Sequence, residues 1–418
     1  MRIVVAALGS RGEVQPFLNL GVGLSENGHD VQMAVPENFM ELVKEHGLGF
    51  VSIRGDFKKM LSSTEGRKLL KSKNPITFVS RIKKLSNELM QTMQDDIYDA
   101  LDGADACVFS YLCGPVIDVA EKTRIPCFLG MVYPVLRTGE YPNLAVTLKN
   151  LGSHFNKWTY DLFTFFMWIA FGSICNNWRK TRLGLSKSPI FQRIEKSGIP
   201  ILAAYSSYVV PKPTDWPVQA NVTGYWFPNV RDDWQATGEL ENFLASGPPP
   251  VCVTFGSMTD NEIDQITKLI KHTLKNERLR GIFVASWSGM GKAEAESNDF
   301  YYLESIPYNW LFPKVAAVLQ HGGAGTLAAT LEAGIPPIVV PFVGDQKFWA
   351  QQVYKLGVAP KPFSRSALNE KRLSSALRIA INDKSLRKKA YELGCSIRGE
   401  NGVAVAIDII HQYLGIKT

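Results

Sequence analysis

A glycine-rich stretch in the second half of the chain carries the clearest chemistry: Gln320-His321-Gly322-Gly323-Ala324-Gly325-Thr326. Its position predicts the end of a strand running into the start of a helix. Glycine lets the backbone approach a ligand closely, and the first N–H groups of a helix favour an anion. His321 adds a side-chain donor at the same place. The stretch is therefore predicted to bind a diphosphate without a metal ion.

Polar residues follow two further predicted strands. Asp345 and Gln346 stand nineteen residues after Thr326, where a carboxylate beside an amide offers acceptors and donors to neighbouring sugar hydroxyls. Upstream, Ser257 lies in Thr254-Phe255-Gly256-Ser257-Met258, again at a strand end. Ligands of open α/β sheets bind outside the strand ends, so we expect these groups to face one edge of a sheet.

Short apolar runs alternate with amphipathic stretches in both halves of the chain. In the first half we expect strands at 2–8, 31–34, 50–53, 106–110 and 126–132, with helices near 16–27, 37–46 and 116–122. In the second half we expect strands at 251–255, 281–287, 300–304, 316–320 and 337–341, with helices at 261–275 and after Gly325. This alternation is typical of parallel, doubly wound α/β sheets.

Proline, tryptophan and glycine accumulate between residues 211 and 250, which predicts a linker without helices or central strands. The expected organisation is an acceptor domain at 1–210, the linker at 211–250 and a nucleotide-sugar domain at 251–400. Residues 401–418 would contain a helix that packs back on the first domain. Two facing domains of this kind predict an active site in the cleft between them.

Several ordered motifs carry a resemblance to a known family. The set comprises Gly9-Ser10-Arg11-Gly12-Glu13-Val14-Gln15-Pro16, Asp215-Trp216-Pro217, Phe255-Gly256-Ser257, Ile306-Pro307-Tyr308-Asn309-Trp310-Leu311-Phe312-Pro313, residues 321–326 and Asp345-Gln346. It resembles the UDP-dependent glycosyltransferases of the GT-B fold, and is most similar to the branch of sterol and antibiotic glycosyltransferases. The motifs span both halves of the chain.

The resemblance implies a role for each matching position. His321, with Gly323, Ala324, Gly325 and Thr326, would bind the diphosphate, while Asp345 and Gln346 would hold the sugar. Ser10, Ser257, Trp287 and Tyr308 would cradle phosphate or uracil. Plant members stack uracil on a tryptophan where Ser305 stands here and bind ribose with a glutamate where Ala329 stands. Trp287 is our substitute for that tryptophan.

Transfer to a hydroxyl needs a general base. Glu13 occupies the position at which plant relatives carry a catalytic histidine and the sterol branch usually carries aspartate, so we expect Glu13 to be the base. A single in-line displacement would convert an α-linked donor into a β-glycoside. The alternative interpretation of Glu13 is an exposed loop carboxylate near Arg11.

Seven aromatic residues crowd positions 158–171. Such a stripe is either helix packing in the core or the lining of a pocket for a flat, apolar acceptor. We expect Phe163, Phe166 and Trp168 to line that pocket. The longest apolar run, 162–175, is 14 residues, shorter than the ~20 that a spanning helix needs.

The net charge of +7 is concentrated between residues 57 and 87, where nine basic residues accompany one acid. This stretch is either a solvated face or a patch that contacts anionic lipid headgroups. No nucleic-acid-binding motif accompanies it. Six scattered cysteines and no signal peptide predict a cytoplasmic protein, peripheral on a membrane in the second interpretation.

The sequence therefore predicts an inverting, metal-independent enzyme with no cofactor that moves glucose from UDP-glucose to a hydroxyl of a sterol-like or other apolar acceptor. A phenolic, flavonoid or polyketide acceptor is the first alternative. A catalytically weak sugar-nucleotide- or lipid-binding protein is the second.

Overall fold

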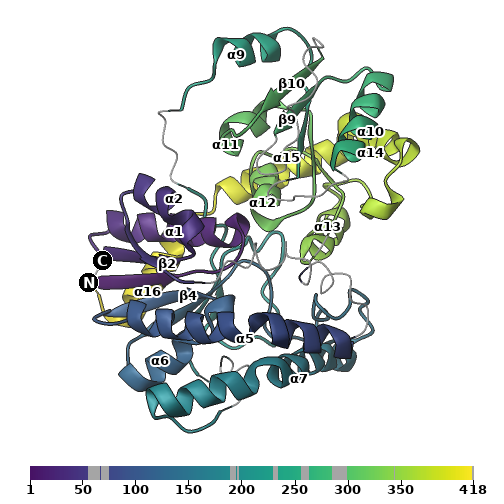
Figure 1. Cartoon of the computed structure of the whole chain (residues 1–418). Coiled ribbons are helices and arrows are strands. Elements are labelled where there is room, and N and C mark those ends of the chain that lie inside the picture. Colours follow the sequence, from purple (N-terminus) through teal and green to yellow (C-terminus); the bar gives the residue numbers. More distant parts are fainter. Residues whose placement is uncertain are drawn as a thin grey trace. The chain divides into compact units, whose positions relative to one another are not determined.

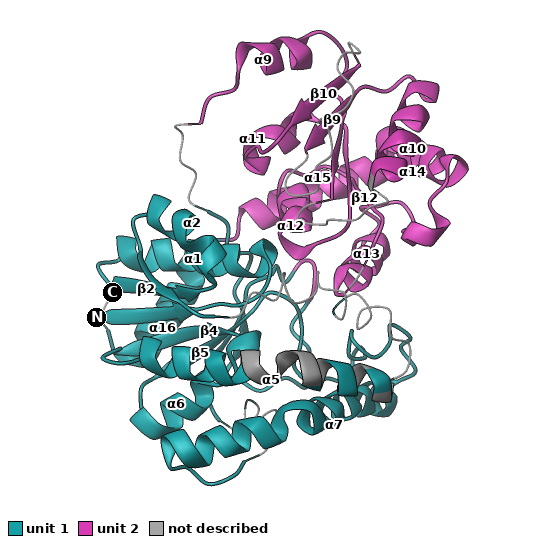
Figure 2. Ribbon diagram, in the orientation of Figure 1, with its two compact units in different colours: residues 1–207, 211–229, 401–418 teal, residues 208–210, 230–400 magenta. Residues whose placement is uncertain are grey.

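The computed structural model describes residues 1–54, 66, 75–188, 194, 197–228, 234–255, 263–284, 299–342 and 344–416. The chain forms two compact units (Figure 2). Unit 1 contains Met1–Ser207, Pro211–Asn229 and Asn401–Thr418, and unit 2 contains Tyr208–Val210 and Val230–Glu400.

The described strands of unit 1 form one parallel sheet in the order β3-β2-β1-β4-β5-β6-β7. Their bounds are β1 Arg2–Ala6, β2 Asp30–Val35, β3 Gly49–Ser52, β4 Ala106–Ser110, β5 Cys127–Met131, β6 Ile201–Ala203 and β7 Ala220–Val222. The order reverses beside β1, where Val5 pairs with Met33 on one side and Val108 on the other. That reversal defines a doubly wound sheet, as predicted.

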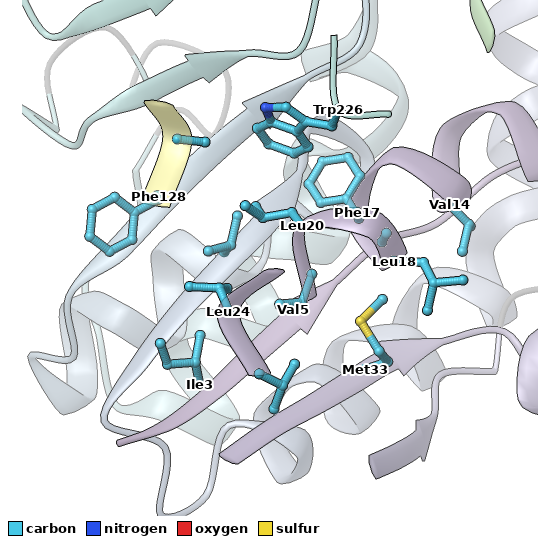
Figure 3. Close-up of a cluster of buried hydrophobic side chains, with 14 of the residues drawn as sticks. Ile3, Val5, Val14, Phe17, Leu18, Leu20, Leu24, Met33, Phe128 and Trp226 are labelled. Carbon is cyan, nitrogen blue, oxygen red and sulfur yellow. The ribbon is translucent and has the colours of Figure 1, made fainter. Parts of the chain in front are cut away.

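Helices cover this sheet (Figure 1). They are α1 Arg11–Glu26, α2 Met40–Glu45, α5 Pro75–Ala100, α6 Val116–Thr123, α7 Ser153–Trp178 and α16 Gly402–Leu414, with short η1 Glu37–Phe39, η2 Tyr111–Cys113 and η3 Arg179–Leu183. Figure 3 shows the core between α1 and the sheet, where the rings of Phe17 and Trp226 meet edge to face at 5.3 Å. Burial of such apolar surface is the main stabilising term.

Unit 2 has its own parallel sheet, in the order β10-β9-β8-β11-β12. Its strands are β8 Val251–Thr254, β9 Gly281–Val284, β10 Phe300–Leu303, β11 Ala317–Gln320 and β12 Pro337–Val339. Its helices are α9 Gly238–Ala245, α10 Ile263–Asn276, α11 Tyr308–Leu311, α12 Ala324–Glu332, α13 Gln346–Lys355, α14 Glu370–Asn382 and α15 Lys384–Arg398, with η4 Phe312–Lys314 and η5 Arg365–Ala367. Among the described residues, a helix follows each of β8, β10, β11 and β12, and the five strands lie where the sequence predicts them.

Two local predictions are wrong. The first helix begins at Arg11 rather than near Pro16, because Ser10 is the N-cap and its N–H donates to Glu13 Oε2 at 3.0 Å. The stretch 211–250 contains strand β7 and helix α9. Its prolines lie at 211–228 and 248–250, so none interrupts Gly238–Ala245, which has Thr237 as its N-cap.

The C-terminal helix α16 packs against α1 within unit 1. A Cβ on Gly23 of α1 would lie 2.5 Å from Val403 Cγ1, so a glycine is required for this close approach. Among the described residues, no helix combines the length and apolarity that crossing a membrane requires.

Candidate active site

The loop after β11 is shaped by two glycines. Gly322 has a φ of 89°, which favours glycine, and a Cβ there would lie 2.6 Å from Val339 Cγ1. Gly323 is the N-cap of α12, and a Cβ on it would lie 2.5 Å from His321 Nε2. The imidazole therefore lies directly against the backbone at the start of α12, as the glycine-rich sequence predicts.

The first N–H groups of α12 have no acceptor among the backbone hydrogen bonds of the helix itself. Those bonds begin with the one from Leu327 N to Gly323 O, at 2.9 Å, so the N–H groups of Ala324, Gly325 and Thr326 precede it. No described side chain caps the helix, and Gly325 is exposed. These N–H groups suit an anion.

His321 is only 8% exposed, and burial lowers its pKa to about 4. The ring is therefore neutral at physiological pH and retains one N–H donor. Its Nδ1 atom is buried without a hydrogen-bond partner among the described residues. A buried polar atom left in this state is the kind of group that a ligand satisfies.

Asp345 and Gln346 lie beside this loop. A Cβ on Gly322 would come within 3.3 Å of the Gln346 carbonyl oxygen, so the two motifs meet within unit 2. Gln346 Oε1 accepts the Phe342 N–H at 2.8 Å, and Trp349 Nε1 donates to Asp345 Oδ2 at 2.9 Å. Burial raises the pKa of Asp345 to about 6 against the opposing Trp349 bond. The sequence pattern did not indicate the role of Trp349.

Tyr308 belongs to the same edge of the sheet. Its hydroxyl lies 3.0 Å from Thr254 Oγ1, and its ring stacks on Phe312 at 4.4 Å. Thr254 ends β8 and pairs in register with Gln320 at the end of β11. Ser257 and Trp287, the other predicted nucleotide contacts, lie outside the described residues.

In unit 1, Glu13 is held by the start of α1. Its Oε2 accepts the Ser10 N–H, and Gly9, with a φ of 123°, lies against the carboxylate. A Cβ on Gly9 would lie 1.7 Å from that oxygen. Glu13 is thus a helix-capping carboxylate in a fixed position, and Ser10 contributes its backbone N–H to holding it.

Ser110, which was not predicted from the sequence, anchors Leu8, the residue before Gly9. Its hydroxyl accepts the Leu8 N–H at 3.2 Å and donates to Cys113 Sγ at 3.5 Å. Burial raises the pKa of Cys113 to about 12, so the thiol is neutral. A serine at the end of β4 is the sequence signal that was available.

The aromatic stripe of α7 divides between two environments. Tyr160 and Phe171 are buried, Phe163 and Phe166 are half-buried, and Trp168 is 47% exposed. Trp158 and Phe165 are also exposed. Within the described parts of the chain, no three His, Cys, Asp or Glu side chains gather as a metal site requires.

Comparisons with known proteins agree with this architecture. Residues 3–142 match the glycosyltransferase family 28 N-terminal domain, and residues 298–400 match the C-terminal domain of erythromycin biosynthesis protein CIII-like proteins. A sterol 3-beta-glucosyltransferase of Arabidopsis thaliana is 31% identical over 99% of this chain and 68% of its own length. One of Cryptococcus neoformans is 32% identical over 99% of this chain, which spans only 27% of that protein.

Solved structures give the same fold. The glycotransferase of kitacinnamycin superposes with a TM-score of 0.74 at 17% identity, covering 98% of both chains. The calicheamicin glycosyltransferase gives 0.73 at 16% identity, covering 99% of this chain and 98% of the other. The resemblance seen in the motifs is therefore confirmed: the chain is a glycosyltransferase of the GT-B fold and belongs to the family that contains the sterol 3-beta-glucosyltransferases.

Proposed function

We propose that this protein transfers glucose from UDP-glucose to the hydroxyl of a sterol, forming a β-glucoside. The names of its relatives in plants and fungi support the sugar and the acceptor class. The observation that carries the donor assignment is the neutral, buried His321 against the uncapped N-terminus of α12.

In the proposed reaction the Glu13 carboxylate takes the proton of the acceptor hydroxyl. The acceptor oxygen forms a bond to the anomeric carbon while the bond from that carbon to the diphosphate oxygen breaks. UDP leaves with the electron pair, and the N–H groups of α12 with His321 stabilise its developing charge. One displacement inverts the anomeric centre. Glu13 is supported by its fixed carboxylate, which accepts the Ser10 N–H.

The remaining donor contacts follow from the same edge of unit 2. Asp345 and Gln346 would accept and donate hydrogen bonds to the glucose hydroxyls. Tyr308, Ser257 and Trp287 would contact the nucleotide. Because N–H groups and His321 carry the leaving-group charge in this proposal, no metal ion or cofactor takes part, and transfer is expected to survive chelation by EDTA.

The test is release of UDP from UDP-glucose, with a panel of sterols and phenolic aglycones, by wild type and matched variants. Glu13→Gln should lower kcat by at least about a hundredfold and His321→Ala should weaken UDP binding. Glu37→Gln and His154→Ala, both at exposed positions, are the controls.

Acceptor-dependent release that survives Glu13→Gln would overturn the base assignment. Release with phenolics alone would favour the alternative acceptor class, and UDP binding without turnover would favour a binding protein.

We further propose that the protein is cytoplasmic and docks on an anionic membrane through α7. On this helix Trp158, Phe165, Trp168 and Ile169 are exposed, and residues 162–178 contain no charged side chain. Met90 of α5 packs against the buried cluster around Phe171 of α7, and further along both helices Asp95 Oδ1 accepts a hydrogen bond from Trp178 Nε1, so α5 and α7 run parallel. The N-terminal half of α5, with Arg81 and the exposed Lys83, therefore lies beside the aromatic stripe. Most of the basic stretch 57–87 is outside the described residues.

An aromatic face flanked by basic residues is typical of interfacial helices. The test is sedimentation with phosphatidylcholine vesicles containing phosphatidylserine. Phe165→Glu with Trp168→Glu should abolish binding, whereas Val218→Glu, at another exposed apolar position of unit 1, should not. Equal binding of all three proteins would refute this surface. Free cysteines throughout, five of them buried, are consistent with a reducing compartment.

A further inference from the structure

Unit 2 contains a cavity of about 830 Å³ whose lining includes none of residues 321–326 of the glycine-rich loop. It is lined by Ala316 and Pro336, which directly precede β11 and β12. His321 follows β11, so this part of the cavity wall and the candidate donor site lie at opposite ends of the same strand. The volume falls within the range of about 300–1,000 Å³ that is usual for small-molecule sites.

One wall of this cavity is a basic face of α15. Lys384, Arg387, Lys388 and Arg398 line it together with Tyr391, which is 61% exposed. At 100° per residue these positions fall on one side of the helix, within an arc of about 100°. All four side chains are exposed, and together they give this wall a positive potential that favours an anionic ligand.

The carboxylates around this wall are few. Glu332, at the end of α12, is the one acidic residue in the lining. Lys388 pairs with Glu392 at 3.7 Å, but both side chains are largely exposed, so the pair is weak. Arg387 donates to the Ile381 carbonyl at 3.3 Å, and Arg398 donates to the Glu332 carbonyl and to Cys395 Sγ. The lining thus keeps a clear excess of positive charge.

Apart from Asn309, the remaining lining residues are apolar, and several of them are small. Ala329 of α12 and Ala333, the residue after that helix, form the floor together with Gly334, which has a φ of 72°. A Cβ on Gly334 would lie 3.1 Å from Tyr391 Cα, so a larger residue there would press on α15. The small floor residues leave space for a ligand, and the basic face of α15 supplies positive charge beside that space.

We infer that this cavity binds a phosphate monoester, with the phosphate on Arg387 and Lys388 and the hydroxyl-bearing part of the ligand toward Glu332. Arg and Lys are the usual partners of phosphate oxygens, and a carboxyl group accepts from or donates to hydroxyls. The ligand is either a soluble sugar phosphate or the headgroup of a phosphate-monoester lipid. The lining contains none of the residues proposed above to bind the diphosphate or the sugar, and it shares with the nucleotide site only Ala329, the position at which plant relatives bind ribose.

Protonation of Glu332 should tune this affinity. Burial raises the pKa of Glu332 to about 7, against the lowering effect of Arg398. The charged and titratable groups that line the cavity with it are Lys384, Arg387, Lys388, Tyr391 and Arg398. Protonation of Glu332 near pH 7 removes a negative charge that repels the phosphate, so binding should strengthen as pH falls from 8 to 7, above the pKa of about 6 at which the phosphate itself takes up a proton.

Calorimetry on the full chain with saturating UDP, which keeps the donor loop occupied, tests the proposal. Glucose 6-phosphate is the soluble probe, and phosphatidylcholine vesicles with phosphatidic acid are the lipid probe. Arg387→Ala with Lys388→Ala should weaken binding by at least about tenfold. Lys389→Ala, an exposed cation of α15 outside the cavity lining, should leave it unchanged. Glu332→Gln should bind more tightly than wild type at pH 8 and should gain less than wild type when the pH falls to 7.

Binding of either probe with this pattern supports the site and identifies its source as soluble or lipid. Binding of neither probe, or equal loss in the Lys389→Ala protein, overturns it. Failure of UDP to bind would contradict only the proposed transferase site. Binding of the phosphate probes to the cavity is measured independently of UDP binding, so its result still stands.

Discussion

The imidazole rings of His29 and His411 meet with their Nε2 atoms 2.8 Å apart. His29 precedes β2 and His411 lies on α16, so the pair joins residues 382 positions apart within unit 1. One Nε2 must donate and the other accept, which holds a single proton between them. A second proton would point two N–H groups at each other.

Acid should therefore loosen α16. Burial, the nearby His411 and the N-terminal amine lower the pKa of His29. A depressed histidine pKa contributes stability above the unfolded value of ~6.5 and loses it as pH falls below that value. Amide exchange of residues 402–414, corrected for its intrinsic pH dependence, should be faster at pH 5 than at pH 7.5. His411→Gln should remove that difference, and α14 serves as the internal reference. Unchanged protection of α16 at pH 5 would contradict the prediction.

Gly9→Ala should separate positioning of Glu13 from donor binding. The new Cβ would overlap Glu13 Oε2, and a φ of 123° strains any other residue. We expect kcat to fall by at least about tenfold, or ~1.4 kcal/mol in activation free energy, with the affinity for UDP unchanged. Gly12→Ala is the matched control, because its Cβ would meet Ser10 Oγ at an ordinary 3.7 Å. Equal activity of both variants would show that the position of the carboxylate does not limit transfer.

Gly323→Ala should act on the donor site instead. Its Cβ would lie 2.5 Å from His321 Nε2 and displace the ring, whereas a Cβ on Gly325 would meet no atom within 4 Å. UDP affinity measured by calorimetry should drop by about tenfold or more for Gly323→Ala. Gly325→Ala should bind UDP within about threefold of wild type. The reverse order would mean that His321 does not contact the diphosphate.

Asp345→Asn should stabilise the protein while impairing transfer. The folded-state pKa of Asp345, about 6, lies above the unfolded value of ~3.9, so folding favours its protonated form. The stability associated with that proton is present at low pH and lost as pH rises through 6. At pH 8 wild type must bury an ionised carboxylate, whereas asparagine is neutral at every pH. The increase in melting temperature of Asp345→Asn over wild type should therefore be larger at pH 8 than at pH 4. A variant that melts below wild type at pH 8 would refute this reading.

Much of the fold follows from local sequence. Strand β4 has the predicted bounds 106–110, and β8, β11 and β12 lie where apolar runs are bounded by glycine and proline. The His321 loop was also predictable, because glycine spacing and a following helix are local properties of the chain. The bounds of the long helices α5 and α7 and of the short strands β6 and β7 were not predictable, because the hydrophobic patterns of these segments are ambiguous or interrupted.

What the sequence determined by itself was the alternation of elements and the chemical types at their ends. The tertiary structure decided which distant side chains meet: Ser110 with Leu8, His29 with His411, and Glu332 with the basic face of α15. It also made His321 neutral and raised the pKa of Asp345, since both shifts come from burial that packing creates. Periodicity is written in neighbouring residues, whereas desolvation and long-range contacts exist only once the chain has folded.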